Sequence, residues 1–150
     1  MIDRSVSVEP AGPNDVASVE ALLKSVKLPT DGVSANLSDF LVARADGRVI
    51  GCVGLEVYGD TAILRSLAVD PARQRGALGT LLAEEILDRA RSKRVTRVVL
   101  LTETAEGFFA RKLGFEVVAR DTVADSARQS WQFTGAVCQS ATCMSRDISS

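Results

Sequence analysis

The sequence contains no histidine, and this absence narrows the chemistry open to the protein. Histidine is the side chain most often used as a general base, so a base here must be a carboxylate, a lysine, water or the main chain. Histidine-based zinc sites and Ser-His nucleophiles are excluded for the same reason. We therefore expect a site that works without a metal.

Cysteine is also scarce, with Cys52, Cys138 and Cys143 the only three. An odd number in a chain expected to be cytosolic does not indicate a disulfide framework. Lone cysteines are more often small buried hydrophobes than ligands, and burial in the core is our first interpretation of all three. The alternative, for Cys138 and Cys143, is a pair of soft thiolate ligands for a thiophilic ligand.

Long apolar runs are missing as well. No segment approaches the roughly 20 apolar residues that span a bilayer, and the N-terminus has no apolar signal segment. We therefore expect a cytoplasmic protein with no membrane partner.

Neither sign of charge is in excess, because 18 basic residues stand against 19 acidic ones. Nucleic-acid binding depends on a surplus of Lys and Arg on one surface, so we expect no nucleic-acid partner. A chain of 150 residues, 46% of them hydrophobic, is typical of one soluble domain with its own core. We expect that single domain to span residues 1–150.

Periodicity in the first half predicts a short strand, two helices and a three-strand antiparallel meander. The strand covers residues 4–9, an amphipathic helix opens at 13–15, and a short helix covers 37–40. The meander is divided by Asp46-Gly47 and Gly59-Asp60, and an Asp-Gly pair between apolar runs is a strong hairpin signal. Its three strands are expected at 41–44, 49–57 and 61–69.

The second half alternates helices and strands. Apolar residues at helical spacing predict a helix over 78–90, and the continuous apolar run 96–102 predicts a strand covered on both faces. A helix over 104–113 is closed by Gly114, and it is followed by a strand at 115–119, a short helix near 123–129 and a last strand near 141–148. The fold class is therefore α/β (α+β), with helices on a mixed sheet.

Residues 67–82 form the segment most informative about function. A buried strand ends at Pro71, an Arg-rich turn with small residues follows, and a helix begins near Leu78. Free backbone amides at the positive end of a helix form a cradle for pyrophosphate, and Arg73 and Arg75 can reach its oxygens. The alternative is an ordinary strand–helix connection with solvated arginines. A P-loop is excluded because no Gly-Lys-Ser/Thr follows, and a Rossmann unit is excluded because the preceding strands form a meander.

This segment resembles the coenzyme-binding motif of the GNAT acetyltransferase family, Q/R-x-x-G-x-G/A. Gln74 takes the first position, Ala77 replaces the first glycine, and Gly79 is the second. A second family segment is similar to Ala105–Phe115, which ends in Leu-Gly-Phe. The resemblance extends over about 40–119 and implies a GNAT fold. That fold has a central mixed sheet of about seven strands flanked by helices, an N-terminal meander and a splayed pair of parallel strands.

The resemblance also implies acetyl-CoA as the cosubstrate and a small-molecule amine as the acceptor. Main-chain groups at the strand end would pair with the pantetheine arm and polarise the thioester carbonyl, the following turn would hold the pyrophosphate, and the later helix would pack beside the coenzyme. The residues assigned to the coenzyme in this way are Leu67, Ala68, Val69, Gln74, Arg75, Gly76, Ala77, Leu78, Gly79, Thr80, Phe108 and Phe109.

The catalytic residues are less well defined by the resemblance. Many family members carry a carboxylate on the strand before the motif, but here that strand has none. The candidates for the general base are Glu56 and Glu103, with water relayed to Glu56 as the preferred scheme. The alternatives are an ion pair of Glu56 with Arg65 across the hairpin, and a helix cap or first-turn acid for Glu103. The family's usual acid, a tyrosine on the helix of Phe108, is missing, and the only tyrosine, Tyr58, is expected to pack.

A weaker similarity to small N-acetyltransferases encoded with arsenic-resistance genes lies in 58–69 and in the tail 138–144. It implies an amino-acid-like acceptor, with an arsenical amino acid as one candidate. Arg65 and Ser66 are then the candidate acceptor-binding residues, since a guanidinium fork matches acid groups. Two other functions stay open, a protein or peptide N-acetyltransferase and a non-catalytic acetyl-CoA-binding module. Exposed strand edges make a homodimer a further hypothesis.

Overall fold

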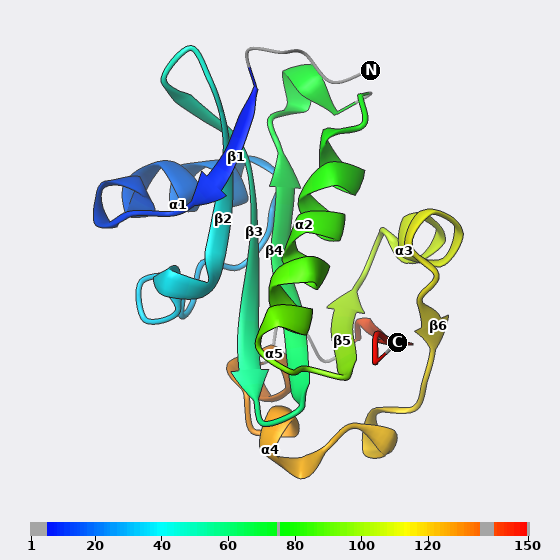
Figure 1. Cartoon of the computed structure of the whole chain (residues 1–150). Coiled ribbons are helices and arrows are strands. Elements are labelled where there is room, and N and C mark those ends of the chain that lie inside the picture. Colours follow the sequence, from blue (N-terminus) through cyan, green and yellow to red (C-terminus); the bar gives the residue numbers. More distant parts are fainter. Residues whose placement is uncertain (1–5, 75, 136–139, 150) are drawn as a thin grey trace. The chain divides into compact units, whose positions relative to one another are not determined.

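A computed structural model describes residues 6–74, 76–135 and 140–149 of the chain (Figure 1). Its strands form one seven-stranded mixed sheet in the order β1-β2-β3-β4-β5-β7-β6. The strands are β1 (Ser7–Pro10), β2 (Phe40–Ala45), β3 (Arg48–Tyr58), β4 (Thr61–Val69), β5 (Arg97–Thr102), β6 (Glu116–Val117) and β7 (Thr142–Asp147). The α-helices are α1 (Val16–Ser25), α2 (Leu78–Ser92), α3 (Glu106–Leu113), α4 (Asp125–Arg128) and α5 (Trp131–Thr134). Short 3-10 turns are η1 (Pro13–Asp15), η2 (Leu37–Asp39), η3 (Pro71–Arg73) and η4 (Arg120–Thr122).

The pairing of the strands confirms the expected mixed sheet. β1 pairs with β2 and β2 with β3 in antiparallel fashion, as the Asp46-Gly47 hairpin requires. β4 and β5 run parallel, and β7 lies antiparallel to both β5 and β6. Asp46 and Gly47 have φ values of +53° and +75°, the left-handed pair that a tight hairpin turn needs.

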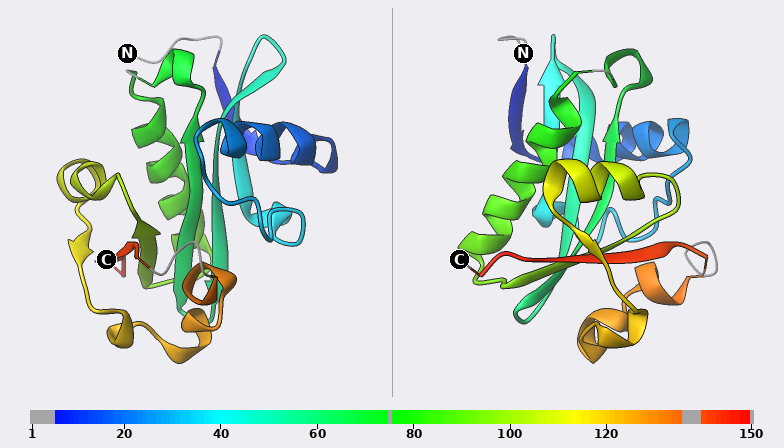
Figure 2. Two further views of the ribbon diagram at one scale, coloured as in Figure 1. Left: turned by 180° about the vertical axis from the view of Figure 1, so that it is seen from behind. Right: turned by 90° about the vertical axis from the view of Figure 1, so that its right-hand side faces the viewer.

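The chain divides into two compact units, and the first comprises residues 1–55 and 66–86. Within it, the strands lie between α1 and the first part of α2 (Figure 2, right). Its core joins the apolar face of α1 to β2 and β3, through Val19, Leu22, Leu23, Val33, Phe40, Val42, Cys52 and Ala68. A glycine at position 54 is required here, because an added Cβ would lie 2.4 Å from the ring of Phe40.

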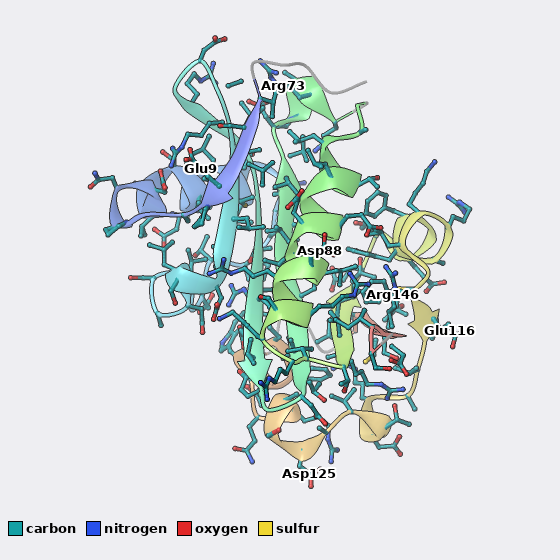
Figure 3. All side chains as sticks on the ribbon, viewed as in Figure 1. Glu9, Arg73, Asp88, Glu116, Asp125 and Arg146 are labelled. Atoms are coloured by element: carbon teal, nitrogen blue, oxygen red, sulfur yellow. The ribbon has the colours of Figure 1, made fainter. Side chains whose placement is uncertain are left out.

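The second unit comprises residues 56–65 and 87–150. Its core contains Ile63, Val99, Val123, Ala127, Phe133 and Cys143. The short helices α4 and α5 lie beside the end of the β3–β4 hairpin, and Asp125 at the start of α4 points away from it (Figures 1 and 3). In α5 the indole of Trp131 covers Gly135, where an added Cβ would lie 2.6 Å from the ring.

Three elements differ from the sequence-based expectations. The helix expected near 123–129 is the single turn α4, because Val123 and Ala124 are extended, and Ser130 then caps a second turn, α5. The strand expected at 115–119 is reduced to β6. α3 begins at Glu106 rather than Thr104, since Thr102 Oγ1 accepts a hydrogen bond from the Ala105 amide before the helix starts.

Candidate active site

β4 contains a local break at Ser66, the residue that precedes the coenzyme segment. Its φ of +60° lies in the left-handed region, which is uncommon for a non-glycine residue and rare inside a strand. The Cys52 thiol donates a hydrogen bond to the Ser66 carbonyl oxygen at 3.2 Å. The pairing of β4 with β5 covers Thr61–Ile63, before this break. Backbone strain of this kind concentrates at functional sites, and here it directly precedes Leu67.

The turn between β4 and α2 is tied together by two side chains at its start. Asp70 Oδ1 accepts a hydrogen bond from the Ala72 amide at 3.0 Å, and Gln74 Nε2 donates to the Val69 carbonyl at 3.1 Å. Gln74, the first residue of the motif, thus holds the strand end and the turn together. Arg73 lies on η3 just before the turn and is exposed (Figure 3). Arg75 lies outside the described residues.

The start of α2 has amides that can bind a ligand. The Leu81 amide donates to the Ala77 carbonyl at 3.0 Å. The amides of 78–80 precede it, and the first-turn amides of a helix generally have no acceptor within their own helix. Gly76 and Ala77 are exposed, Gly79 and Thr80 are half-buried, and Leu78 is buried. The described part of the turn is therefore open at Gly76 and Ala77.

The aromatic pair of α3 has two different environments. Phe109 is buried, with its ring edge-on to Phe108 at 5.2 Å and to Phe115 at 5.7 Å between centroids. Phe108 is half-buried. Gly114 closes the helix with φ +69°, as its place in Leu-Gly-Phe predicts. Phe109 is thus a packing residue of α3, and Phe108 is the one of the pair with exposed surface.

A buried polar cluster occupies the end of the β3–β4 hairpin in the second unit. Glu56, Arg65 and Ser130 are 6%, 4% and 5% exposed. Glu56 Oε2 accepts a hydrogen bond from Arg65 Nη1 at 2.8 Å, which makes this a buried ion pair. Glu56 Oε1 accepts two more, from Tyr58 Oη at 2.6 Å and from Ser130 Oγ at 2.5 Å. The cross-hairpin ion pair considered from the sequence is therefore present.

The tyrosine of this cluster is a hydrogen-bond donor rather than a simple packing residue. Burial, and then its hydrogen bond to Glu56, raise the pKa of the Tyr58 hydroxyl above its ordinary value of 10.0. Tyr58 therefore stays protonated and continues to donate to Glu56 throughout the neutral range.

Glu103 lies directly after β5 and is exposed. Its Oε1 accepts a hydrogen bond from Ser140 Oγ at 3.0 Å. The N-cap of α3 is Ala105 and its first-turn acid is Glu106. The helix-cap interpretation of Glu103 is therefore wrong, because the helix begins two residues later than expected.

The structure brings some of the predicted residues together and adds one that was missed. Glu56 and Arg65 are in direct contact, whereas Ser66 to Val69 and Gln74 to Thr80 belong to the strand–turn–helix segment. Ser130 was missed, and its only sequence signal is a serine before Trp131-Gln132-Phe133, typical of a helix N-cap. Its side chain does accept from the Gln132 amide at 3.1 Å. Nothing in the sequence indicated its contact with Glu56, 74 positions away.

The described cysteines, Cys52 and Cys143, are both buried and reduced. Burial raises the pKa of the Cys143 thiol, which disfavours the thiolate form that a soft metal or arsenic would need. Cys138 lies outside the described residues. Within the described ranges, no three His, Cys, Asp or Glu side chains gather as a metal site would require. None of the helices described has the length and apolar character to cross a bilayer.

A seven-stranded mixed sheet with helices, in which a turn with exposed residues leads from β4 into α2, defines an α/β protein. Comparison with known proteins assigns the class more narrowly. The sequence model of the Acetyltransferase (GNAT) family matches residues 15–115. The chain belongs to this family.

Individual relatives are consistent with that assignment. An amino-acid acetyltransferase from Neisseria meningitidis is 25% identical over 139 residues, which cover 87% of this chain and 32% of that protein. An amino-acid acetyltransferase from Mycobacterium tuberculosis is 39% identical over 66 residues, 43% of this chain and 37% of that protein. The chain therefore spans only about a third of the length of these relatives.

Two solved structures have the same fold. N-acetylglutamate synthase from Neisseria gonorrhoeae, complexed with coenzyme A and N-acetyl-glutamate, superposes with a TM-score of 0.85 at 23% identity, over 98% of this chain and 36% of that one. Rv2747 from Mycobacterium tuberculosis, in complex with CoA and NLQ, superposes with a TM-score of 0.79 at 25% identity, over 95% and 99% of the two chains.

Proposed function

We propose that this protein transfers the acetyl group of acetyl-CoA to the amine of a small, amino-acid-like molecule. The observation that carries the proposal is the open turn before α2, with the first-turn amides of 78–80 at the positive end of a 15-residue helix. Family membership supports acetyl-CoA as the molecule whose diphosphate lies there. The complexes of both structural relatives contain coenzyme A.

In the proposed complex, the residues around the turn hold the coenzyme. Amides from Gln74 through Thr80 bind the diphosphate, with Arg75 as a cation beside it. Main-chain groups of Leu67, Ala68 and Val69, which directly follow the break at Ser66, pair with the pantetheine arm and polarise the thioester carbonyl. Phe108, the half-buried member of the aromatic pair, lines the pantetheine arm, and the ring of Phe109 packs against Phe108.

The reaction needs few protein groups beyond these. The acceptor nitrogen forms a bond to the acetyl carbon, the carbon–sulfur bond breaks, a proton leaves the nitrogen, and the sulfur takes a proton from water. Holding both substrates together supplies much of the rate. A carboxylate that accepts the proton adds about 10²–10⁴-fold.

Glu56 is the carboxylate we propose for this step, with Glu103 as the alternative. Three donors fix Glu56, two of them on Oε1 and one, Arg65, on Oε2, and we propose that a water relays the proton to this carboxylate. Exposure of Glu103 supports access to it, but its single partner, Ser140, holds it less firmly. We propose Arg65 and Ser66 as acceptor contacts, with Arg65 meeting an acid group of the acceptor.

The amino-acid acetyltransferases among the relatives support an amino-acid acceptor. An arsenical amino acid remains one candidate within that class, because its acid group has the same charge as a carboxylate. A cytoplasmic location and a homodimer are further parts of the hypothesis. Cell fractionation tests the location, and the molecular mass of the protein in solution tests the homodimer.

The experiment is release of free thiol from acetyl-CoA against a panel of amino acids, arsenical amino acids, polyamines and basic peptides. Turnover with amino acids supports the proposal, turnover with peptides alone favours a peptide acetyltransferase, and coenzyme binding without turnover favours a non-catalytic module. Glu56→Gln and Glu103→Gln are compared in the same assay. The base is the residue whose replacement lowers kcat by about 10²-fold or more.

A further inference from the structure

Ser130 contacts the candidate base from a part of the chain outside the region that the family model matches. That region ends at residue 115, and α5 begins after Ser130. Yet the Ser130 hydroxyl is only 2.5 Å from Glu56 Oε1, and the residue is 5% exposed. Such a short hydrogen bond to a carboxylate in a buried site belongs to the strong, charge-assisted class.

The hydroxyl of Ser130 has partners on both sides. It donates to Glu56 and accepts a hydrogen bond from the Gln132 amide at 3.1 Å, and it also lies close enough to Tyr58 to oppose the rise in the pKa of that hydroxyl. Tyr58 donates to the same carboxylate oxygen, and Arg65 donates to the other one. Glu56 is therefore held by donors from β3, β4 and the N-cap of α5.

We propose that Ser130 is a positioning residue for the acetyl transfer, which together with Tyr58 and Arg65 fixes the orientation of the Glu56 carboxylate. Two donors occupy Oε1, whose two lone pairs are then both used, and Arg65 occupies Oε2. The orientation of the base thus depends on Ser130, at the N-cap of α5.

The inference rests on the proposed function of Glu56, and its test separates the two. We compare Ser130→Ala, Ser130→Thr, Tyr58→Phe and Glu56→Gln with the wild-type protein. Thr122→Val is the matched control, because its hydroxyl bonds to the Ala119 carbonyl in the same segment and does not contact Glu56. For each variant we measure the melting temperature, the Kd of coenzyme A, kcat and KM for the acceptor, and the pH dependence of kcat/KM.

Ser130→Ala is expected to lower acceptor kcat/KM about tenfold, since a hydrogen bond to a charged group is lost. The Kd of coenzyme A should not change. Tyr58→Phe, which removes one hydroxyl and no helix cap, should lower acceptor kcat/KM in the same way. Ser130→Thr should restore most of the activity, and Thr122→Val should behave as wild type.

Two patterns would overturn the inference. In the first, Glu56→Gln is inactive, whereas Ser130→Ala and Tyr58→Phe fold and keep wild-type acceptor kinetics. Ser130 would then be only a helix cap, and the proposed role of Glu56 would stand. If Glu56→Gln is fully active, or the wild-type protein turns over no amine, the proposed role of Glu56 fails and the inference fails with it.

Discussion

Single residues carry much of the geometry of the candidate site, and Ser66 is the clearest example. Its φ of +60° interrupts β4 immediately before the main chain that we assign to the thioester. A side chain at such a position costs free energy unless the surroundings compensate, and here Cys52 bonds to the Ser66 carbonyl. No propensity scale would place a left-handed serine inside the run 61–69, so this feature could not be predicted from the sequence.

Replacement of Ser66 tests the strain. We expect Ser66→Gly to keep or slightly raise stability, within about 1 kcal/mol, because glycine adopts this φ freely. Ser66→Val should destabilise by roughly 1–3 kcal/mol, because a β-branched residue is strained at positive φ. Urea denaturation measures both. Equal stability of the two variants would show that position 66 is not left-handed.

Asp15 gives a prediction for acid stability. The hydrogen bond from Arg44 Nη2, 2.7 Å from Asp15 Oδ2, holds the pKa of this carboxyl below its ordinary value of 3.8, and the Gly12 amide adds to the effect. The stabilisation is present above that ordinary value and is lost as the pH falls through the lowered one. Asp15→Asn should thus destabilise the protein near neutral pH by about 1–2 kcal/mol. Thermal melts should show a difference between the two proteins that shrinks as the pH falls below 3.8, and a constant difference would contradict the assignment.

Tyr58 is the only tyrosine in the chain, so the tyrosinate absorbance reports on this residue alone. Burial and the Glu56 carboxylate should move its titration above pH 10.0 in the folded protein. In urea the midpoint should return to about 10, the value of an exposed tyrosine. A folded-state midpoint at or below the unfolded one would show that the hydroxyl is solvated.

At the level of elements, prediction succeeded where one local pattern determines the structure. The apolar stripe of α2, the buried run of β5 and the Asp46-Gly47 turn each depend on neighbouring residues, and all three appear in the structure. The segment after α3 was less predictable because its helices are single turns. The positions of apolar residues in this segment, such as Val123 and Phe133, are set by packing in the core of the second unit and do not follow a helical period.

The start of α2 is the element on which the coenzyme assignment depends. Gly79→Glu places a carboxylate among the amides of 78–80, where it competes with a diphosphate for the same donors. We expect it to raise the Kd of coenzyme A by roughly tenfold or more. Lys24→Gln, an exposed position on α1, changes the net charge by the same amount and serves as the control. Isothermal titration measures both, and equal effects would locate the coenzyme elsewhere.

For the whole molecule, the long-range contacts set the limit of prediction from the sequence. Composition, periodicity and the motif were sufficient for the fold class, whereas the position of the cradle stays a prediction. The hydrogen bond between Ser130 and Glu56 joins residues 74 positions apart, and no local pattern encodes it. It exists because chain segments are brought together by burial of apolar side chains, which is non-directional.

Binding of the coenzyme should stabilise the protein as a whole. At a ligand concentration 100 times the Kd, the folded state gains about 2.7 kcal/mol. For a chain of this size, that corresponds to a rise in Tm of roughly 5–10 °C. Thermal melts with acetyl-CoA, and with adenosine as a control lacking the diphosphate, measure the effect. A rise with adenosine equal to that with acetyl-CoA would argue against a diphosphate cradle.

Trp131, whose indole covers Gly135, directly follows Ser130 and is the only tryptophan in the chain. Its fluorescence therefore comes from one place, the first position of α5. Any rearrangement of that turn when an acceptor is bound would alter the polarity around the indole, and the emission would shift. The protein thus carries an intrinsic optical probe next to Ser130, and unlabelled protein is enough to follow that step in time.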